Sequence, residues 1–438
     1  MHTPLANNIR GLFVTSDRNL SSGETGQTMP NFDAIKTSAG QQGVLPSIDE
    51  SLAHRAGDVK VSIIIPVYNT SEYLHQCLDS AVNQTLKEIE IIVIDDASTD
   101  NSLEIIRQYE RQDGRIRVIA FEENRGNGFG RNEAMRQATG AYLMFLDSDD
   151  WLDENAVDIV YRKAITQAFD VVMYGHISHH TDSRKNKTSQ LVCQPTLADN
   201  DPDFFKYLMQ QRKGLSCMPW QYLIERKLAM SNDILFSEGI YFEDVIFTIK
   251  AAYYAKSIAV LKLPLYNYRR REGSITTSAS KKKIADMFAS LGIVKEFLEA
   301  EGIFKQYQRE YLIRFLMHGV CCNFLDYFTL SKKNRDMELD DYMDRIRKSK
   351  LLCKENLLLL NHAISELNQD EARSKRFYML CYRIMSSLMY GYRTFWFSYK
   401  LSFWIHENLQ NLFDHLHKMK FLSMDFQMPM PQQARKVG

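Results

Sequence analysis

Between residues 59 and 176 the sequence alternates short apolar runs with longer amphipathic stretches. The first run, at 59–68, reads Val-Lys-Val-Ser-Ile-Ile-Ile-Pro-Val-Tyr, the pattern of a strand covered on both faces. In the stretch after Ser71, apolar residues recur at helical spacing, which predicts a helix with one buried stripe: Leu74, Cys77, Leu78, Ala81 and Val82. Strands alternating with helices indicate βαβ units. We therefore expect an α/β domain whose mostly parallel sheet is flanked by helices.

Two acidic clusters fall where predicted strands end. The same alternation predicts strands at 90–95, 115–121, 141–147 and 170–176, and helices at 101–111, 127–138 and 154–167. Asp95-Asp96 ends one of these strands, and the cluster from Asp147 to Asp150 ends another. Ligands of parallel α/β sheets bind beyond the carboxyl ends of the strands. The two clusters therefore mark a candidate site.

The remainder of the chain divides into segments that differ in composition and in hydrophobic periodicity. Residues 1–58 are polar without a sustained period, which predicts a mostly disordered arm, with a short helical docking segment as the alternative. Residues 178–200 are polar and lysine-rich, as expected of a surface loop, and the spacing predicts a helix that ends near 254. Beyond 281 the pattern is almost wholly helical. We expect a catalytic α/β domain at 59–280 and an α-helical domain at 281–438.

Charge and cysteine usage restrict the partners. Lys+Arg and Asp+Glu both total 54, so the formal net charge is zero and nothing suggests non-specific nucleic-acid binding. Seven cysteines without a CxxC motif fit a reducing compartment. We find no apolar run of the length of a signal peptide or a membrane span. These features predict a cytoplasmic protein, with the inner face of the plasma membrane as a candidate contact.

An aromatic segment at 376–406 is interleaved with Arg383, Arg393 and Lys400. This composition suits an amphipathic helix on an anionic membrane surface, and it equally suits a packed helix pair of the C-terminal domain. Both interpretations stay open, and the helical domain is also a candidate contact for a homo-oligomer.

Several residues near the acidic clusters could carry chemistry. The carboxylates of Asp147, Asp149 and Asp150 could bind Mg²⁺ or Mn²⁺, or could form an acidic turn that caps the next helix. Asp96 could accept a hydrogen bond from a nucleobase or a ribose, unless this turn is only a helix cap. Arg131 follows a glycine loop that is neither GxGxxG nor a P-loop.

A second acidic pair, Glu243-Asp244, directly precedes an apolar helix. The helix dipole favours an ionised carboxylate there, so we expect Asp244 to be deprotonated at neutral pH and able to act as a base. Helix capping is the alternative. The basic run from Arg269 to Arg271, with the turn that follows it, could close over anionic oxygens or could simply be a solvated face.

Five segments, taken in order, resemble the family 2 inverting glycosyltransferases. They are Val-Ser-Ile-Ile-Ile-Pro-Val-Tyr-Asn at 61–69, Ile-Asp-Asp-Ala-Ser-Thr-Asp-Asn-Ser at 94–102, Gly-Arg-Asn-Glu-Ala at 130–134, Phe-Leu-Asp-Ser-Asp-Asp at 145–150 and Glu-Asp-Val-Ile-Phe at 243–247. Pro219-Trp220, Arg226 and Gly-Ser-Ile-Thr at 273–276 look like later blocks of the bacterial polysaccharide branch. The resemblance covers about 60–280 and implies a Rossmann-like GT-A fold, a nucleotide-sugar donor that is most often a UDP-sugar, and Mn²⁺ or Mg²⁺.

The resemblance also implies a role for each matched residue. Pro66, Tyr68 and Asp96 would hold the nucleoside, with Arg131 assisting. Asp149 would be the first metal ligand, with Asp147 and Asp150 beside it, and Asp147 and Ser148 would contact the donor. Ser274, together with Arg271, would steady the diphosphate. Asp244 would be the base, with Glu243 adjacent, and Trp220 would contact a glycan or lipid-linked glycan acceptor of the bacterial surface.

The chemistry of these residues is consistent with that implication. Inverting transfer needs one positioned base, whereas a glycosidase needs two carboxyl groups that flank the bond. Two other functions remain as alternatives: a non-catalytic nucleotide-sugar or glycan binding module, and a sugar nucleotidyltransferase. The second would need a glycine-rich loop with a lysine after the first strand, and Asn69-Thr70-Ser71-Glu72 is not such a loop.

Overall fold

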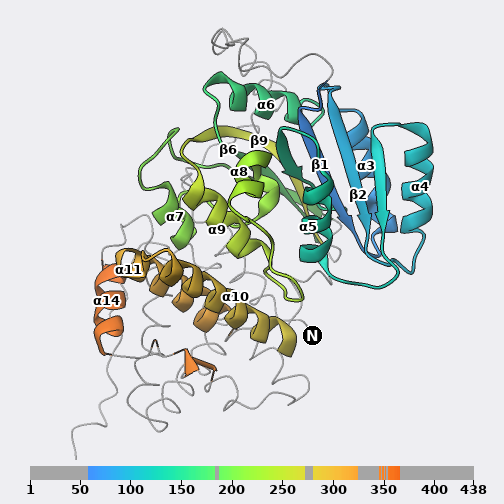
Figure 1. Cartoon of the computed structure of the whole chain (residues 1–438). Helices are drawn as coiled ribbons and strands as arrows, with labels where there is room; N and C mark the ends of the chain where they lie inside the picture. The colour runs from blue at the N-terminus through green and yellow to red at the C-terminus, as the bar shows by residue number, and fades with distance from the viewer. Residues whose placement is uncertain are drawn as a thin grey trace, which may run out of the picture.

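A nine-stranded mixed sheet forms the centre of the computed structural model (Figure 1). The structure describes residues 58–182, 187–271, 280–323, 345–346, 348–349, 351 and 354–365. The strand order is β3-β2-β1-β4-β8-β6-β9-β5, and β7 pairs with β6. The strands are β1 (Val61–Val67), β2 (Ile89–Asp95), β3 (Ile116–Ala120), β4 (Tyr142–Phe145), β5 (Trp151–Leu152), β6 (Val171–Asp182), β7 (Lys187–Cys193), β8 (Tyr222–Glu225) and β9 (Ile258–Arg270).

The described helices comprise those between the strands and a C-terminal group. They are α3 (Ser71–Val82), α4 (Ser102–Gln112), α5 (Asn127–Gln137), α6 (Ala156–Thr166), α7 (Phe204–Gln210), η1 (Pro219–Gln221), α8 (Arg226–Ser231), α9 (Asp244–Tyr254), α10 (Lys281–Ala300), α11 (Phe304–Arg314), η2 (Phe315–Cys322) and α14 (Lys354–Ser365). Within the described ranges, no helix combines the length and the apolar character needed to span a bilayer.

Strand direction determines where the site can form. Strands β1, β2, β3 and β4 pair in parallel. The short strand β8 runs antiparallel to both β4 and β6, so β6 again points in the direction of β1, and β9 is parallel to β6. The carboxyl ends of β1, β2, β4 and β9 therefore share one edge of the sheet.

The α/β class with flanking helices is confirmed, but the sheet is less parallel than the sequence predicts. The predicted loop at 178–200 is wrong for much of its length, because β6 continues to Asp182 and forms a hairpin with β7. Since β7 pairs only with β6, this hairpin lies at a margin of the sheet where polar side chains can face water. The strand β9 was not predicted either; its Pro264 lies where the register with β6 shifts, so no regular ladder hydrogen bond is lost.

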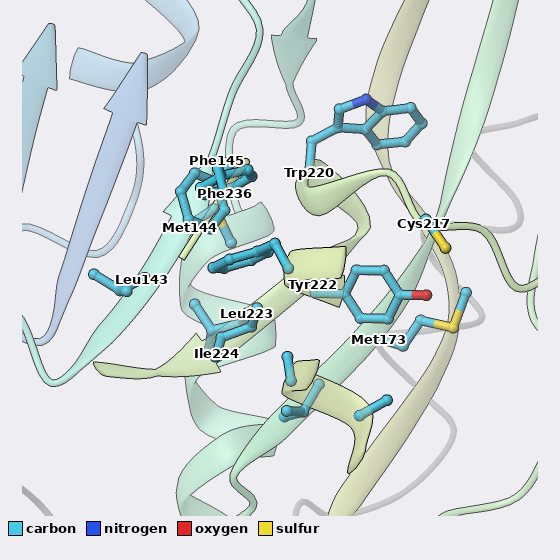
Figure 2. Close-up of a cluster of buried hydrophobic side chains, with 14 of the residues drawn as sticks. Leu143, Met144, Phe145, Met173, Cys217, Trp220, Tyr222, Leu223, Ile224 and Phe236 are labelled. Carbon is cyan, nitrogen blue, oxygen red and sulfur yellow. The ribbon is translucent and has the colours of Figure 1, made fainter. Parts of the chain in front are cut away.

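The core packs β4 against β8 and against helix α9. Leu143, Met144 and Phe145 of β4 lie beside Leu223 and Ile224 of β8 (Figure 2). The Phe145 ring meets the Phe236 and Phe247 rings edge-on, with centroids 5.2 and 5.4 Å away, and these two rings stack at 3.9 Å. This aromatic cluster links the end of β4 to α9, the helix that begins at Asp244.

The helical character of the C-terminal region is borne out for α10, α11, η2 and α14. Helices α10 and α11 lie on the side of the sheet where α9 and α7 pack (Figure 1). The predicted disordered arm at 1–58 lies outside the described residues except for Asp58, and the aromatic segment at 376–406 lies wholly outside them.

A buried arginine joins α11 to the sheet domain. Arg314 is 1% exposed, and its guanidinium donates to the carbonyl oxygens of Leu208 and Met209 at 2.7 and 2.9 Å. These carbonyls belong to the last turn of α7, where a helix leaves acceptors unsatisfied. The same guanidinium lies 3.3 Å from the Sγ of Cys217. Arg314 thus ties the helices after residue 280 to the domain before it.

We expect Arg314→Leu to lower the stability of the whole protein. An orphaned buried acceptor costs about 1–3 kcal/mol. This substitution takes the Arg314 donor from the Met209 carbonyl, while the Leu208 carbonyl keeps the Gln211 N–H, so the free energy of unfolding should fall by about that amount. Urea denaturation followed by circular dichroism measures the loss. The matched control is Arg162→Leu on α6, whose surface pair with Asp158 is worth at most about 1 kcal/mol. Equal stability of the two variants would contradict this role.

Candidate active site

Tyr68 and Pro66 differ in what they offer at the end of β1. Tyr68 is 44% exposed, whereas Pro66 is buried inside the strand opposite Ile94. The next residues are held from across the crevice, because Asp100 accepts hydrogen bonds from the backbone amides of both Ser71 and Ser102, each at 3.0 Å. Of the two residues that were expected to hold a nucleoside here, only Tyr68 presents a surface.

Asp96 organises the glycine loop. Its carboxylate accepts hydrogen bonds from the backbone amides of Arg125 and Gly126, at 2.7 and 2.8 Å. Gly126 has a φ of 83°, a left-handed conformation that glycine adopts without strain. Asp96 follows the end of β2 and is 3% exposed. Through these two hydrogen bonds it shapes the loop that leads into α5.

The acidic turn after β4 is held by a tyrosine that the sequence analysis missed. Tyr266 of β9 donates its hydroxyl hydrogen to Oδ2 of Asp150 at 2.7 Å and accepts the backbone N–H of Asp147 at 3.2 Å. The other carboxylate oxygen of Asp150 accepts the amide of Arg269 at 2.7 Å. Burial, with Asp149 and Asp147 nearby, raises the pKa of Asp150 well above its usual range.

Two arginines from β9 and its end contact Asp149. Arg271 donates from Nε to Oδ2 of Asp149 at 2.6 Å, and Arg269 donates from Nε to the Asp149 carbonyl oxygen at 2.8 Å. The Arg269 guanidinium also lies over the rings of Tyr73 and Trp151, 5.0 and 4.8 Å from their centroids. Arg271 thus lies beside the acidic turn, and its predicted contact with the diphosphate stays a prediction. Ser274 lies outside the described residues.

Arg131 is a buried bridge between the two acidic segments. It is 3% exposed and donates from Nη2 to Oδ1 of Asp147 and from Nη1 to Oε1 of Glu243, both at 2.7 Å. The predicted contact of Arg131 with the donor is therefore not supported, because its guanidinium is committed to two carboxylates. For the same reason Glu243 is a poor candidate for the base.

Asp244 is the first residue of α9. Its side chain is half-buried, and its carboxylate accepts a hydrogen bond from its own backbone amide. Burial, followed by the charges of Glu243 and Asp147, raises the pKa of Asp244 to about 8, although Arg131 opposes this. The expectation that the helix dipole keeps Asp244 ionised at neutral pH is thus wrong for the unliganded protein, because desolvation and like charges outweigh the dipole.

The donor set fits a divalent cation only in part. Within the described ranges, no group of three or more His, Cys, Asp or Glu side chains is arranged to hold a metal. Arg131 pairs with one carboxylate oxygen of Asp147, and Arg271 pairs with one carboxylate oxygen of Asp149. Each of the two carboxylates therefore keeps its other oxygen for a cation. Mg²⁺ commonly binds through one or two carboxylates together with substrate phosphates and water. Asp147 and Asp149 suit that mode, whereas Asp150 does not, because both of its oxygens are used internally.

Two further predicted contacts are buried. Trp220 is 2% exposed and stacks on Tyr266 with ring centroids 4.3 Å apart, so its indole offers no face to an acceptor (Figure 2 shows its place beside the core). Ser148 is 5% exposed, and its hydroxyl accepts from Oγ1 of Thr70 at 2.9 Å. Both residues support the acidic turn instead of contacting a ligand in this structure.

The sequence analysis also missed Asn132, although it stands next to Arg131 in a quoted motif. Its side chain is 1% exposed and bonds to both the amide and the carbonyl of Phe236, at 2.9 and 3.0 Å. Tyr266 was missed because strand β9 was not predicted. The alternation of side chains from Leu261 onward was the signal that could have revealed that strand.

Comparison with known proteins gives concordant matches. The model of "Glycosyl transferase family 2" matches residues 62–229. The chain is 31% identical over 267 residues to the putative glycosyltransferase EpsH of Bacillus subtilis (strain 168), across 60% of this chain and 76% of that protein. It is 32% identical over 230 residues to the poly(ribitol-phosphate) beta-N-acetylglucosaminyltransferase TarS of Staphylococcus aureus, across 50% of this chain and 37% of that protein.

A solved structure shares the fold. The crystal structure of S. aureus TarS 1–349 in complex with UDP-GlcNAc superposes with a TM-score of 0.52 at 22% sequence identity, covering 80% of this chain and 92% of that one. This likeness agrees with the predicted fold class and places the sheet edge described above in a known architecture.

The raised pKa of Asp244 predicts how stability changes with pH in EDTA. The folded protein holds this proton more tightly than the unfolded chain, so the free energy of unfolding should fall as pH rises from about 4, the ordinary carboxyl value, to about 8. Asp244→Asn removes this contribution. The variant should therefore melt at a higher temperature than the wild type at pH 8, and the difference should shrink towards pH 5.

Thermal melts across this pH range provide the measurement. The control is Asp158→Asn, which alters a surface pair with Arg162 and should not change the pH dependence. A difference in melting temperature between Asp244→Asn and the wild type that is the same at every pH would contradict the raised pKa of Asp244.

Proposed function

The chain belongs to glycosyl transferase family 2, and from that premise we propose that it moves a sugar from a nucleotide-sugar donor to a hydroxyl of a bacterial surface glycan, with inversion at the anomeric carbon. The observation that carries this proposal is the position of Asp244. It is a half-buried carboxylate at the first residue of the helix that the Arg131 bridge ties to the acidic turn.

In the proposed step Asp244 acts as the base. Its carboxylate takes the proton of the acceptor hydroxyl while the acceptor oxygen forms a bond to the anomeric carbon. The bond from that carbon to the diphosphate breaks, and its electron pair leaves with the diphosphate. A base is most effective when its pKa lies near the working pH, and a value of about 8 meets that condition. Glu243 remains ion-paired to Arg131 and keeps the start of α9 in place.

We assign the donor to the edge between β1 and β9. Tyr68 offers an exposed ring for the nucleoside, beside Asp96, and Arg271 is placed to pair with the diphosphate. Asp147 and Asp149 would hold Mn²⁺ or Mg²⁺, which when bound would neutralise charge that develops on the leaving diphosphate. Support for a UDP-sugar comes from the fold neighbour, whose crystal structure contains UDP-GlcNAc.

The acceptor class follows from the relatives. TarS is named for transfer to poly(ribitol phosphate), and a beta-glucosyltransferase of Bacillus spizizenii that acts on the same type of polymer is 34% identical over 206 residues. A polyol or sugar hydroxyl of a surface polymer is therefore the proposed acceptor. The cytoplasmic location, membrane contact through 376–406, a homo-oligomer and the domain boundary at 280 stay predictions.

The first test of the mechanism is Asp244→Asn. We expect kcat to fall by about 10²–10⁴-fold, the usual contribution of a general base, while donor binding is little changed because the amide has nearly the same shape. Initial rates with radiolabelled UDP-sugars and calorimetric titration with UDP measure the two quantities. Asp158→Asn serves as the matched control.

The outcomes separate the competing functions. Near-normal turnover of the Asp244→Asn variant would remove Asp244 as the base. A wild-type protein that binds nucleotide sugars but transfers nothing to any surface polymer would be a non-catalytic binding module. Release of pyrophosphate from UTP and a sugar phosphate would instead identify a nucleotidyltransferase.

The donor and its metal dependence can be tested by thermal stabilisation. A ligand at a hundredfold excess over its Kd stabilises the folded state by about 2.7 kcal/mol. We expect a shift with UDP and Mn²⁺, a smaller or absent shift with GDP or CDP, and loss of the shift in EDTA. Asp149→Ala should weaken the metal-dependent shift, whereas Asp158→Ala should not. A shift with GDP alone would change the proposed donor, and a shift that is equal in EDTA would exclude a metal role in binding.

A further inference from the structure

A strained turn lies immediately before the proposed base. Residues 237–243 lead from the core to α9, and Phe242 has a φ of 64°. This left-handed conformation is unfavourable for a bulky residue and persists only where the surroundings impose it. Because Asp244 follows two residues later, whatever holds this turn also determines where the carboxylate of Asp244 points.

Helix α5 holds the first side of the turn. Asn132 bonds to the backbone of Phe236, and its Nδ2 also donates to Oε1 of Glu238 at 2.9 Å. Arg131 pairs with Glu243 at the end of the turn. Gly128 approaches so closely that an added Cβ would lie 2.1 Å from the Ser237 carbonyl oxygen, so no side chain fits there.

Helix α10 holds the other side through three residues spaced four apart, which places them on one face. Asp286 accepts the backbone N–H of Tyr241 at 2.9 Å on Oδ2, the same oxygen that accepts from Nζ of Lys282 at 2.6 Å. Lys282 also donates to the carbonyl oxygen of Gly239 at 3.0 Å. Ser290 donates to the carbonyl oxygen of Phe242 itself at 3.2 Å.

Asp286 and Ser290 are shielded from water, whereas Lys282 is not. Asp286 is 8% exposed and Ser290 is 2% exposed. The Lys282 side chain is 52% exposed, and its Nζ lies 4.8 Å from the centroid of the Tyr241 ring. A second acid–base pair on the same helix, Lys295–Glu299, has the same spacing but is half-exposed at Glu299 and makes no contact with the turn. The Lys295–Glu299 pair can therefore serve as a control for the Lys282–Asp286 pair on the same helix.

We propose that Asp286, assisted by Lys282 and Ser290, is a positioning residue for catalysis: it holds the turn at Phe242 so that Asp244 faces the acceptor hydroxyl. The proposal rests on the proposed function, in which Asp244 is the base. It also makes α10 a part of the catalytic unit, although the sequence places this helix in a separate domain.

The test compares Asp286→Ala with Asp286→Asn. The alanine variant loses the acceptor for the Tyr241 amide, so we expect kcat to fall by about 10–10²-fold, as a misplacement near 1 Å can cause. The donor KM and the melting shift with UDP should be unchanged. The asparagine variant keeps an oxygen that can accept the Tyr241 N–H, and it should recover most of the lost kcat. Glu299→Ala, the matched control, should behave as wild type.

Double variants separate this proposal from the assignment of the base. If Asp286 acts through Asp244, adding Asp286→Ala to Asp244→Asn should reduce the residual kcat little further. A full additional loss in that background would overturn the positioning role while leaving Asp244 as the base. Near-normal turnover of Asp244→Asn alone would instead overturn the proposed base.

A weaker variant covers the case in which Asp286→Ala does not fold. Ser290→Ala removes one hydrogen bond to the turn, and it should lower kcat severalfold with the donor KM unchanged. Wild-type kcat in a folded Ser290→Ala or Asp286→Ala variant would overturn the proposal.

Discussion

The ion pairs of the buried Arg131 guanidinium hold the site together. Asp147 and Glu243 come from distant parts of the chain, and their carboxylates would repel each other if brought to one place without a cation. Arg131 is itself almost fully buried, and a buried guanidinium is tolerable here because it donates a hydrogen bond to each of the two carboxyl groups. The acidic turn after β4 and the start of α9 can therefore lie side by side, and the pKa of Asp244 is raised first by burial and then by the neighbouring charges of Glu243 and Asp147.

The residues of the matched motifs divide into two groups once the chain is folded. Asp150, Ser148, Trp220 and Arg131 are buried and contact internal partners, so they support the site. Tyr68, Asp149 and Asp244 keep a free face or a free oxygen and can meet a ligand. The supporting group keeps the other group in place, since a carboxylate on a mobile turn could not be aligned with a reacting bond.

The helices beyond residue 280 are not an appendage. Arg314 caps α7 in the sheet domain, and Asp286 and Ser290 hold the turn before α9. Separating the two regions would take the Arg314 donor from the Met209 carbonyl and the Asp286 acceptor from the Tyr241 amide, which would expose or orphan these backbone groups. The described part of the helical region thus serves the same site that the sheet forms.

The sequence by itself determined the order of strands and helices from 61 to 166 and the edge at which the acidic clusters meet, because hydrophobic periodicity and short motifs are local properties. It did not determine the β6–β7 hairpin, whose polar alternation resembles a loop until a neighbouring strand is present. It also did not determine the pairing of β9, which forms its ladder beside β6. Only the tertiary structure decided the roles of individual site residues. Whether Arg131 faces a ligand or two carboxylates, and whether Asp244 is ionised, depends on charges and burial supplied by segments more than a hundred residues apart, as in the Arg131–Glu243 pair at a separation of 112 residues.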